Sequence, residues 1–299
     1  MPSSTASSRL LVLGASGRLG RTVLGHLLDS LHVAPERIIA ASRTPENLKE
    51  IAQRGVETRR YDVTDPSTFE SALDGVSRVL LVSTHSDSGP TFKALLDVMA
   101  SKGVEHVLYT SYYGVETSTV LFAPTFREAE RIIRESKVPN YTMLRNGYYW
   151  EIILAAYSAA LKTGKWYSAA KNAGITYISI DALALANATA LVGDKPVPQV
   201  VTLSGPEGLT VEEIVATFNK VLDKSFEAVH ATHDETVAFL TEHSTFAASP
   251  GFIIASIDQG ASTGEVAAVI DDYEKLVGVK PPTLIQWLEE NKEMLLQMQ

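Results

Sequence analysis

Residues 9–24 read RLLVLGASGRLGRTVL, and this stretch decides the fold. An apolar run of the kind found in buried strands leads into a turn with three glycines, after which apolar residues recur at helical spacing. Gly14 permits the tight turn, Gly17 allows a phosphate group to approach the backbone, and Gly20 lets the helix pack closely on the strand. The stretch therefore predicts a strand, a phosphate-binding turn and a helix in direct succession.

The start of this helix is the predicted anion site. Its amide groups point outward and the helix carries a partial positive charge there, so phosphate groups are held by the backbone. We include Ser16, Arg18 and Leu19 with the three glycines in the cofactor site. A glycine motif of this spacing is often a chance match, but its position between a strand and a helix favours dinucleotide binding.

Through the first half of the chain, short apolar runs alternate with longer amphipathic stretches. This alternation is typical of parallel strands joined by crossover helices. We predict strands at 9–13, 37–41, 56–61, 78–83, 106–111 and 141–145, and helices at 17–30, 45–54, 91–102 and 124–136. Residues 9–150 are thus expected to form a Rossmann-type α/β domain with a doubly wound parallel sheet.

After Arg145 the pattern changes. Residues 151–299 are expected to form a smaller, mainly helical C-terminal lobe, with elements that return to the sheet and a cleft between the two parts. Within this lobe we predict a helix capped by Asp181, a strand at 199–203 and helical structure through 226–229. The small polar residues 1–8 are expected to be a disordered tail rather than a signal peptide.

Composition limits the classes of partner. The chain has 299 residues, a formal net charge of −9 and no cysteine. Nucleic acid is not an expected partner, because the chain has no basic cluster, and disulfides and thiolate metal sites are excluded. The spacing of its histidines fits no metal-binding helix, and its apolar runs are too short to span a membrane. We expect a cytoplasmic protein, and the sequence leaves a homodimer open.

The residues after the second and third strands bear on the choice of cofactor. NAD-dependent enzymes usually place Asp or Glu after the second strand, whereas this chain has Arg43. Arg43 can pair with a 2′-phosphate, which favours NADPH, although it can also be a solvated residue at a helix start. Asp62 and Val63 are placed for the adenine edge, and Asp62 can equally cap a turn.

Ligands of an open parallel sheet lie beyond the carboxyl ends of its strands. The residues expected there are Ser83, Thr84, Ser111, Asn146 and Gly147, with Tyr112, Tyr113 and Tyr148 as candidate catalytic proton donors. The alternative for each tyrosine is an aromatic side chain that only lines the pocket. Trp150, Trp166 and Tyr167 are expected near the cleft.

Several motifs in order resemble one family. They are residues 14–20, 41–43, 62–66, 80–83, 109–111, 144–149, 176–184, 203–206 and 277–282. Together they resemble the NmrA-like atypical short-chain dehydrogenases/reductases, and most of all the NAD(P)H:quinone oxidoreductase and triphenylmethane reductase proteins. The resemblance implies bound NADPH, with Ser83 and Thr84 beside the cofactor and Asn146, Gly147 and Tyr148 near its nicotinamide.

The chain departs from this family at the proton donor. Relatives often carry His or Lys early in the helix before the sixth strand, and this chain has Phe126 there. The only Tyr-x-x-x-Lys is Tyr167–Lys171, which follows the sixth strand and is not expected to act. Glu128, Glu130, Arg131 and Arg134 are interpreted as a solvated helix face.

Two functions from different classes are compatible with these features. The first is an NADPH-dependent oxidoreductase that reduces a quinone-like or aromatic polyketide-like small molecule in the cleft. A quinone needs less acid assistance than an ordinary carbonyl, which suits Phe126. The second is a non-catalytic NAD(P)-sensing regulator that acts through a protein partner, because the fold alone does not separate sensors from enzymes.

Overall fold

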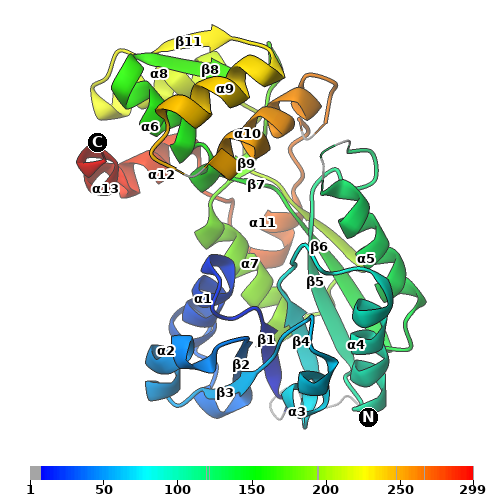
Figure 1. Ribbon diagram of the computed structural model, residues 1–299. Coiled ribbons are helices and arrows are strands. Elements are labelled where there is room, and N and C mark those ends of the chain that lie inside the picture. Colours follow the sequence, from blue (N-terminus) through cyan, green and yellow to red (C-terminus); the bar gives the residue numbers. More distant parts are fainter. Residues whose placement is uncertain are drawn as a thin grey trace.

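The glycine turn follows β1 (Leu10–Leu13), an inner strand of a parallel sheet. The computed structural model describes residues 8–298 except 119, 121, 194, 247 and 266, and the side chains of 248–250 are left aside. The sheet contains seven described strands in the order β10-β6-β5-β4-β1-β2-β3, all parallel (Figure 1). They are β1 (Leu10–Leu13), β2 (Ile38–Ser42), β3 (Glu57–Arg60), β4 (Arg78–Leu81), β5 (His106–Tyr112), β6 (Asn140–Asn146) and β10 (Val200–Leu203). This confirms the predicted Rossmann-type fold.

Helices cover both faces of the sheet, which explains why the inner strands β1, β2 and β4 are mainly apolar and buried. Leu10 and Val12 of β1 belong to the core shared with α1 and α7, whereas Leu11 and Leu13 belong to the core on the α3, α4 and α5 side. These helices are α1 (Arg18–Gly25), α2 (Lys49–Gln53), α3 (Phe69–Leu73), α4 (Gly89–Ser101), α5 (Ala123–Glu135), α7 (Ile180–Val192) and α11 (Asp272–Val277). Because side chains alternate along a strand, the inner strands supply residues to both cores.

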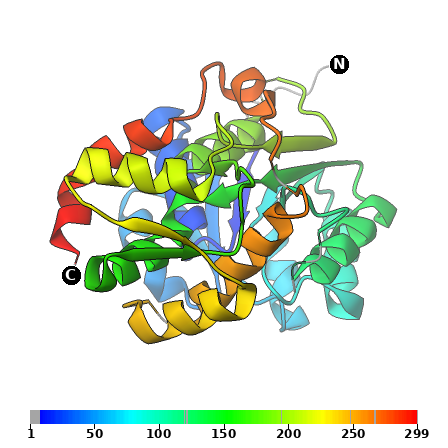
Figure 2. The same cartoon turned by 90° about the horizontal axis from the view of Figure 1, so that it is seen from above.

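A second group of elements lies beyond the carboxyl ends of the strands (Figures 1 and 2). It consists of α6 (Leu154–Thr163), β8 (Lys165–Ser168), α8 (Val211–Leu222), β11 (Glu227–His230), α9 (His233–His243), α10 (Ala248–Ala261), α12 (Leu284–Glu290) and α13 (Lys292–Gln297). A short parallel pair, β7 (Tyr148–Tyr149) and β9 (Tyr177–Ile178), lies between this upper group and the sheet.

The structure corrects several details of the sequence prediction. Residues 226–229 are not helical, because Glu227–His230 pairs with Lys165–Ser168 as a parallel strand. Helix α3 was not predicted. The N-cap of α7 is Ser179 rather than Asp181, because the Ser179 hydroxyl accepts the amide hydrogen of Ala182 at 3.1 Å. Of the expected N-terminal tail, residues 1–7 lie outside the described residues and Ser8 is buried.

Helix α7 returns the chain to the sheet and packs along α1. The His26 ring, just after α1, lies 3.0 Å from the Asp181 carboxylate in the first turn of α7. The amide of Ile180 donates to both carboxylate oxygens of Glu151 at 3.2 Å. These polar contacts fix α7 against α1, next to the glycine turn.

The His26–Asp181 pair makes a pH-dependent contribution to stability. Its hydrogen bond to Asp181 raises the pKa of His26 above 6.5. The stabilisation is therefore complete below that value and is lost as the pH rises through the folded-state pKa. We expect His26→Gln to lower the free energy of unfolding by about 0.5 kcal/mol at about pH 5.5, and by less at about pH 8.5.

Urea unfolding at the two pH values measures this difference. Asp97→Asn is the control, because it breaks the exposed Lys93–Asp97 pair, which contains no histidine. An equal loss at both pH values in His26→Gln would mean that His26 acts by packing alone.

Candidate functional site: a dinucleotide groove and the chamber beside it

The glycine turn forms one wall of a groove at the carboxyl ends of β1 and β4. Gly14 has φ +80°, and a Cβ built there would lie 3.1 Å from Cβ of Val82 in the loop after β4. Only glycine adopts this conformation readily, and only glycine lets the two loops approach so closely. The cofactor groove has a volume of about 410 Å³ and is lined by Gly14, Ser16, Gly17, Ser42, Arg43, Tyr61, Asp62, Val63, Thr64, Val82, Ser83, Thr84, His85 and Ser86.

The three glycines have different tasks. A Cβ on Gly20 would lie 2.5 Å from the Gly14 carbonyl oxygen, so glycine is required for α1 to pack against β1. A Cβ on Gly17 would meet only that same oxygen, at 3.4 Å, and otherwise faces the open groove. No described side chain caps the start of α1. The first amides of this helix are therefore available to phosphate groups.

The predicted cofactor residues divide into two sets. Gly14, Ser16, Gly17, Arg43, Asp62, Val63, Ser83 and Thr84 line the groove, whereas Arg18, Leu19 and Gly20 do not. The Arg18 guanidinium instead lies 3.9 Å from Glu151. Sequence reasoning missed Ser42, Thr64, Val82 and Ser86 as groove residues.

Arg43 and Asp62 lie at one end of the groove. Arg43 is exposed and has no ion pair within 4 Å among the described residues. Asp62 caps a turn, because its carboxylate accepts hydrogen bonds from the amide and hydroxyl of Thr64 at 2.9 and 2.8 Å. These bonds lower the pKa of Asp62, and Arg43 lowers it further. A guanidinium in this position can bind a phosphate at the adenosine end of a dinucleotide.

The side chain of Asp87 holds the loop that follows β4. This carboxylate is fully buried and accepts hydrogen bonds from the amide and hydroxyl of Thr84, at 2.6 and 2.7 Å. The hydroxyl of Tyr109 in β5 also donates to it, at 3.3 Å. Burial raises the pKa of Asp87 to about 6, although the bonds from Thr84 oppose this. Asp87 therefore positions the loop that carries Ser83 and His85.

Beside the groove lies a second hollow, here named the inner chamber. It has a volume of about 190 Å³ and is lined by Ser83, His85, Ser111, Tyr112, Phe122, Phe126, Asn146, Gly147, Tyr148, Tyr149, Ile152 and Ile253. Ser83 and His85 also line the cofactor groove, so the two are continuous. The structure thus brings together the residues predicted after the fourth, fifth and sixth strands.

The chamber walls are mainly aromatic. Tyr112 contacts both Phe122 and Phe126 edge-on, with ring centroids 5.2 Å apart in each pair. Burial raises the pKa of Tyr112 to about 12, and burial raises the pKa of Tyr148 further still. Both phenols therefore keep their protons at neutral pH. Phe126, at the position where the family resemblance implies His or Lys, lines this chamber and supplies no proton.

Other aromatic residues expected at the cleft lie elsewhere. The hydroxyl of Tyr113 donates to the Ala268 carbonyl at 3.0 Å, and Tyr113 does not line the chamber. Trp150 is fully buried and stacks on Trp287. Trp166 packs edge-on against Phe218 in the core of the upper group, and Tyr167 stacks on Phe239, so neither belongs to the chamber.

Asn146 and Gly147, at the end of β6, form a polar part of the inner chamber wall. Asn146 lines the chamber, and its amide is buried and makes no hydrogen bond of normal geometry within the described residues. A Cβ on Gly147 would lie 2.9 Å from the Leu203 carbonyl oxygen, so a side chain is excluded there.

The interpretation of Glu130 as a solvated residue was wrong. Glu130 is 2% exposed and its carboxylate accepts two hydrogen bonds from Arg145 of β6, at 3.1 and 2.9 Å. Burial alone raises the pKa of Glu130, but the bonds from Arg145 outweigh this and hold it below its ordinary value. The pair ties α5 to β6 behind the chamber.

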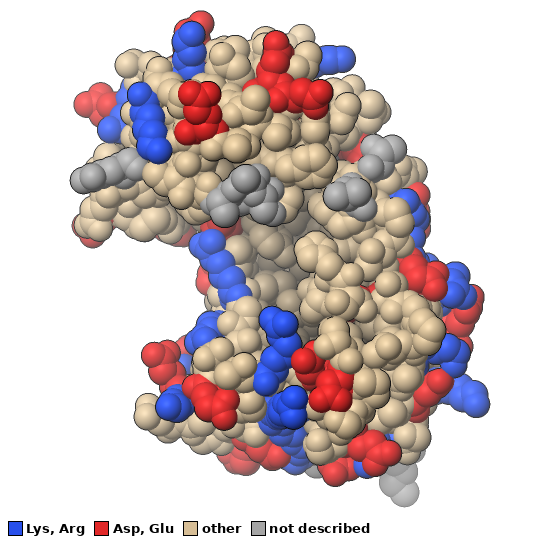
Figure 3. Space-filling view, viewed as in Figure 1, with Lys and Arg blue, Asp and Glu red and all other residues tan. Residues whose placement is uncertain are grey.

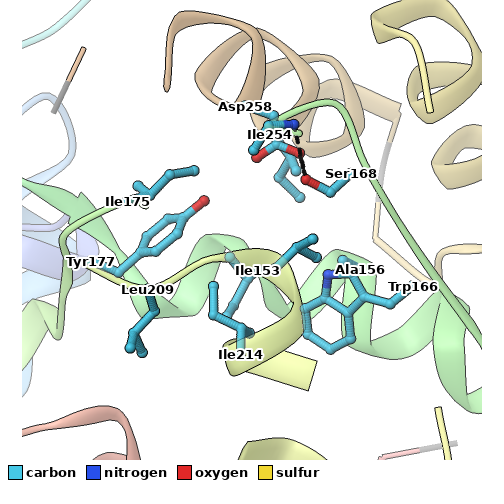
Figure 4. Close-up of a pocket in the computed structure, with 12 residues that line it drawn as sticks. Ile153, Ala156, Trp166, Ser168, Ile175, Tyr177, Leu209, Ile214, Ile254 and Asp258 are labelled. Atoms are coloured by element: carbon cyan, nitrogen blue, oxygen red, sulfur yellow. Dashed lines mark hydrogen bonds between the residues drawn. The ribbon is translucent and has the colours of Figure 1, made fainter. Parts of the chain in front are cut away.

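A separate small cavity of about 20 Å³ lies within the upper group (Figure 4). Its lining includes the buried Asp258, whose carboxylate accepts hydrogen bonds from the Ser168 hydroxyl at 2.7 Å and the Ala169 amide at 3.0 Å. Burial raises the pKa of Asp258 to about 6. This cavity shares no residue with the groove or the inner chamber, and Asp258 ties α10 to the end of β8.

The space-filling view shows the molecule hollowed between the upper group and the sheet (Figure 3). Lysine and arginine side chains stand along the lower lip, while uncharged residues form most of the visible interior. Among the described residues, no helix is long and apolar enough to cross a membrane. The parallel sheet, its glycine turn and the groove at the β1–β4 junction define a dinucleotide-binding protein of the Rossmann class.

Comparisons with known proteins agree with this geometry. Residues 14–151 match the model of a protein family described as NAD(P)H-binding. The chain is 28% identical over 281 residues to quinone oxidoreductase 2 of Escherichia coli, covering 93% of this chain and 96% of that protein. The chain is an NAD(P)H-dependent oxidoreductase, and the predicted resemblance is confirmed.

Two solved structures are similar over nearly the whole chain. Triphenylmethane reductase of Citrobacter sp. has a TM-score of 0.83 and 28% identity, covering 97% of this chain and 100% of that one. The NADPH-dependent quinone oxidoreductase of Escherichia coli complexed with NADPH has a TM-score of 0.85 and 27% identity, covering 94% of this chain and 99% of that one.

The glycine turn gives a direct test of the cofactor groove. Asp is a preferred N-cap residue, so Gly17→Asp should cap α1 and preserve stability. Its carboxylate would then occupy the phosphate position, and we expect NADPH affinity to fall about a hundredfold or more. Fluorescence titration with NADPH measures the affinity, and thermal unfolding without cofactor measures the stability.

Gly25→Asp is the matched control. Gly25 is the last residue of the same helix, and a Cβ built on it meets nothing within 4 Å. This variant should bind NADPH as the wild type does. Normal affinity in Gly17→Asp would show that the phosphates bind elsewhere.

Proposed function

We propose that the protein reduces a quinone-like or similar conjugated aromatic compound, with NADPH as the reductant and the inner chamber as the acceptor site. The main support for this proposal is that the aromatic chamber adjoins the cofactor groove, with Ser83 and His85 lining both. An apolar chamber with a few convergent polar groups suits a flat, uncharged ligand. The relatives named quinone oxidoreductase and triphenylmethane reductase support this substrate class.

The residues present fit a bound dinucleotide. The α1 amides and the open face of Gly17 would hold the pyrophosphate, and Arg43 the 2′-phosphate. Asn146, which lines the inner chamber, would lie at the nicotinamide end. When bound, NADPH supplies hydride to the acceptor.

The protein's own task is to orient the acceptor and stabilise the charge that develops on its oxygen. The hydroxyls of Tyr112 and Tyr148 remain protonated, so they can donate hydrogen bonds to that oxygen. Phe126 excludes water and gives no acid assistance. This arrangement favours acceptors that delocalise the added charge over a conjugated ring.

Arg43 should determine the preference for NADPH over NADH. A charge-assisted hydrogen bond is worth about 1.5–3 kcal/mol, so Arg43→Ala should weaken NADPH binding about tenfold or more and leave NADH binding nearly unchanged. Fluorescence titrations with both cofactors measure this. Arg60→Ala, on the exposed edge strand β3, is the control. An equal loss of affinity for NADPH and NADH would show that Arg43 does not bind the 2′-phosphate.

The reaction itself is tested with a panel of quinones and triphenylmethane dyes. We expect acceptor-dependent loss of NADPH absorbance at 340 nm, a wavelength that reports the reduced nicotinamide. Tyr148→Phe and Tyr112→Phe should each lower kcat/KM about tenfold, because each removes one hydrogen-bond donor. Tyr113→Phe is the matched control, since its hydroxyl is bound to Ala268 outside the chamber.

The outcome also separates the two candidate functions. Tight NADPH binding without turnover of any acceptor would favour the NAD(P)-sensing regulator, for which Phe126 in the chamber is the supporting feature. Unequal binding of the oxidised and reduced cofactors would then be the expected property.

A further inference from the structure

Next to the inner chamber lies a second hollow, here named the outer chamber. It has a volume of about 300 Å³ and is lined by His85, Val120, Phe122, Thr125, Phe252, Ile253 and Ser256. His85, Phe122 and Ile253 line both chambers, so the two share a common wall. The order along the molecule is thus cofactor groove, inner chamber and outer chamber.

The outer chamber is built from segments far apart in the sequence. Thr125 comes from the first turn of α5, and Phe252, Ile253 and Ser256 come from α10 of the upper group. Phe252 is 40% exposed at the rim and packs edge-on against His233. The chamber therefore connects the site to solvent along the junction of α5 and α10.

The lining selects against charged ligands. The described lining contains no Asp, Glu, Lys or Arg, and the Ser256 hydroxyl is already used in a hydrogen bond to the Phe252 carbonyl at 2.8 Å. A charged group would lose its hydration there and find only His85 and Thr125 as polar partners. A hydrocarbon group would gain by leaving water.

The volumes of the two chambers favour a ligand that occupies both. Ligand pockets typically have volumes of about 300–1,000 Å³, and the inner chamber alone, at about 190 Å³, falls below this range. The two chambers together fall within it. The inner one suits a single flat ring, which leaves the outer one for whatever that ring carries.

We propose that the acceptor has two parts, a flat redox ring in the inner chamber and an uncharged hydrocarbon substituent in the outer chamber. This inference rests on the proposed function and adds a substrate class to it. The expected substrates are alkyl- or isoprenyl-substituted quinones rather than bare or anionic ones. Thr125, Phe252 and Ser256 are then determinants of specificity.

The test compares para-benzoquinones that carry no substituent or a linear alkyl chain of increasing length. Burying one methylene gives about a fourfold gain, so kcat/KM should rise about fourfold per carbon until the chamber is full. Thr125→Trp should fill the outer chamber and bring the ratio between long-chain and unsubstituted quinone close to one. Phe252→Ala, which shortens the wall at the rim, should reduce the same ratio.

Thr125→Val is the matched control, because it keeps the size of the side chain and removes only its hydroxyl. It should retain the full dependence on chain length. Thermal unfolding with NADP⁺ bound checks that each variant is folded.

Failure of this proposal can be told from failure of the proposed function. If the unsubstituted quinone is reduced but chain length has no effect, or if the effect persists in Thr125→Trp, the two-part substrate is overturned and the reductase function stands. If no quinone is reduced, calorimetric titration of the NADP⁺-loaded protein with the matching alkyl hydroquinones decides. Affinity that rises with chain length and is lost in Thr125→Trp supports the outer chamber, and affinity independent of chain length overturns it.

Discussion

The close approach of helix α1 to strand β1 is the constraint on which the rest of the structure depends. A Cβ on Gly20 would lie only 2.5 Å from the Gly14 carbonyl oxygen, so the approach is possible with glycine alone. It directs the first amides of α1 into the groove and gives α7 a surface to pack on. Because His26 and Glu151 hold α7 in place, the chain can leave the sheet after β6, form α6 and β8 of the upper group, and return as β10.

Buried charges in this protein position loops rather than react. Asp87 holds the loop after β4, and the Glu130–Arg145 pair fixes α5 to β6 behind the chamber. Each charge is satisfied by hydrogen bonds, which is the condition for burying it at acceptable cost. The chamber that they frame is therefore left with phenols, hydroxyls and one amide, together with a histidine at its edge.

The local sequence pattern was sufficient to predict the sheet and most of the groove, because strand periodicity, glycine geometry and the position of strand ends are properties of short segments. Contacts between segments that are far apart in the sequence could not be predicted in this way. Residues 226–229 form a strand only because β8 pairs with them, and Ile253 reaches the chamber from α10, far from the other lining residues in sequence. Glu130 looked solvated because its partner, Arg145, lies on another element. Alternation alone could have separated Tyr112 from Tyr113, since adjacent residues of an extended chain point to opposite sides.

The inner chamber contains phenols that are only weak acids, and the proposed quinone acceptor needs no stronger acid. Reduction of an isolated carbonyl creates a localised alkoxide, which needs a proton during the reaction. A hydroquinone anion is the conjugate base of a phenol, whose ordinary pKa is about 10. In the proposed reaction Tyr112, with a pKa of about 12, would keep its proton beside such an anion and donate a hydrogen bond to it. The anion would then be released and protonated by solvent, so the proposed reaction does not require an acid at Phe126.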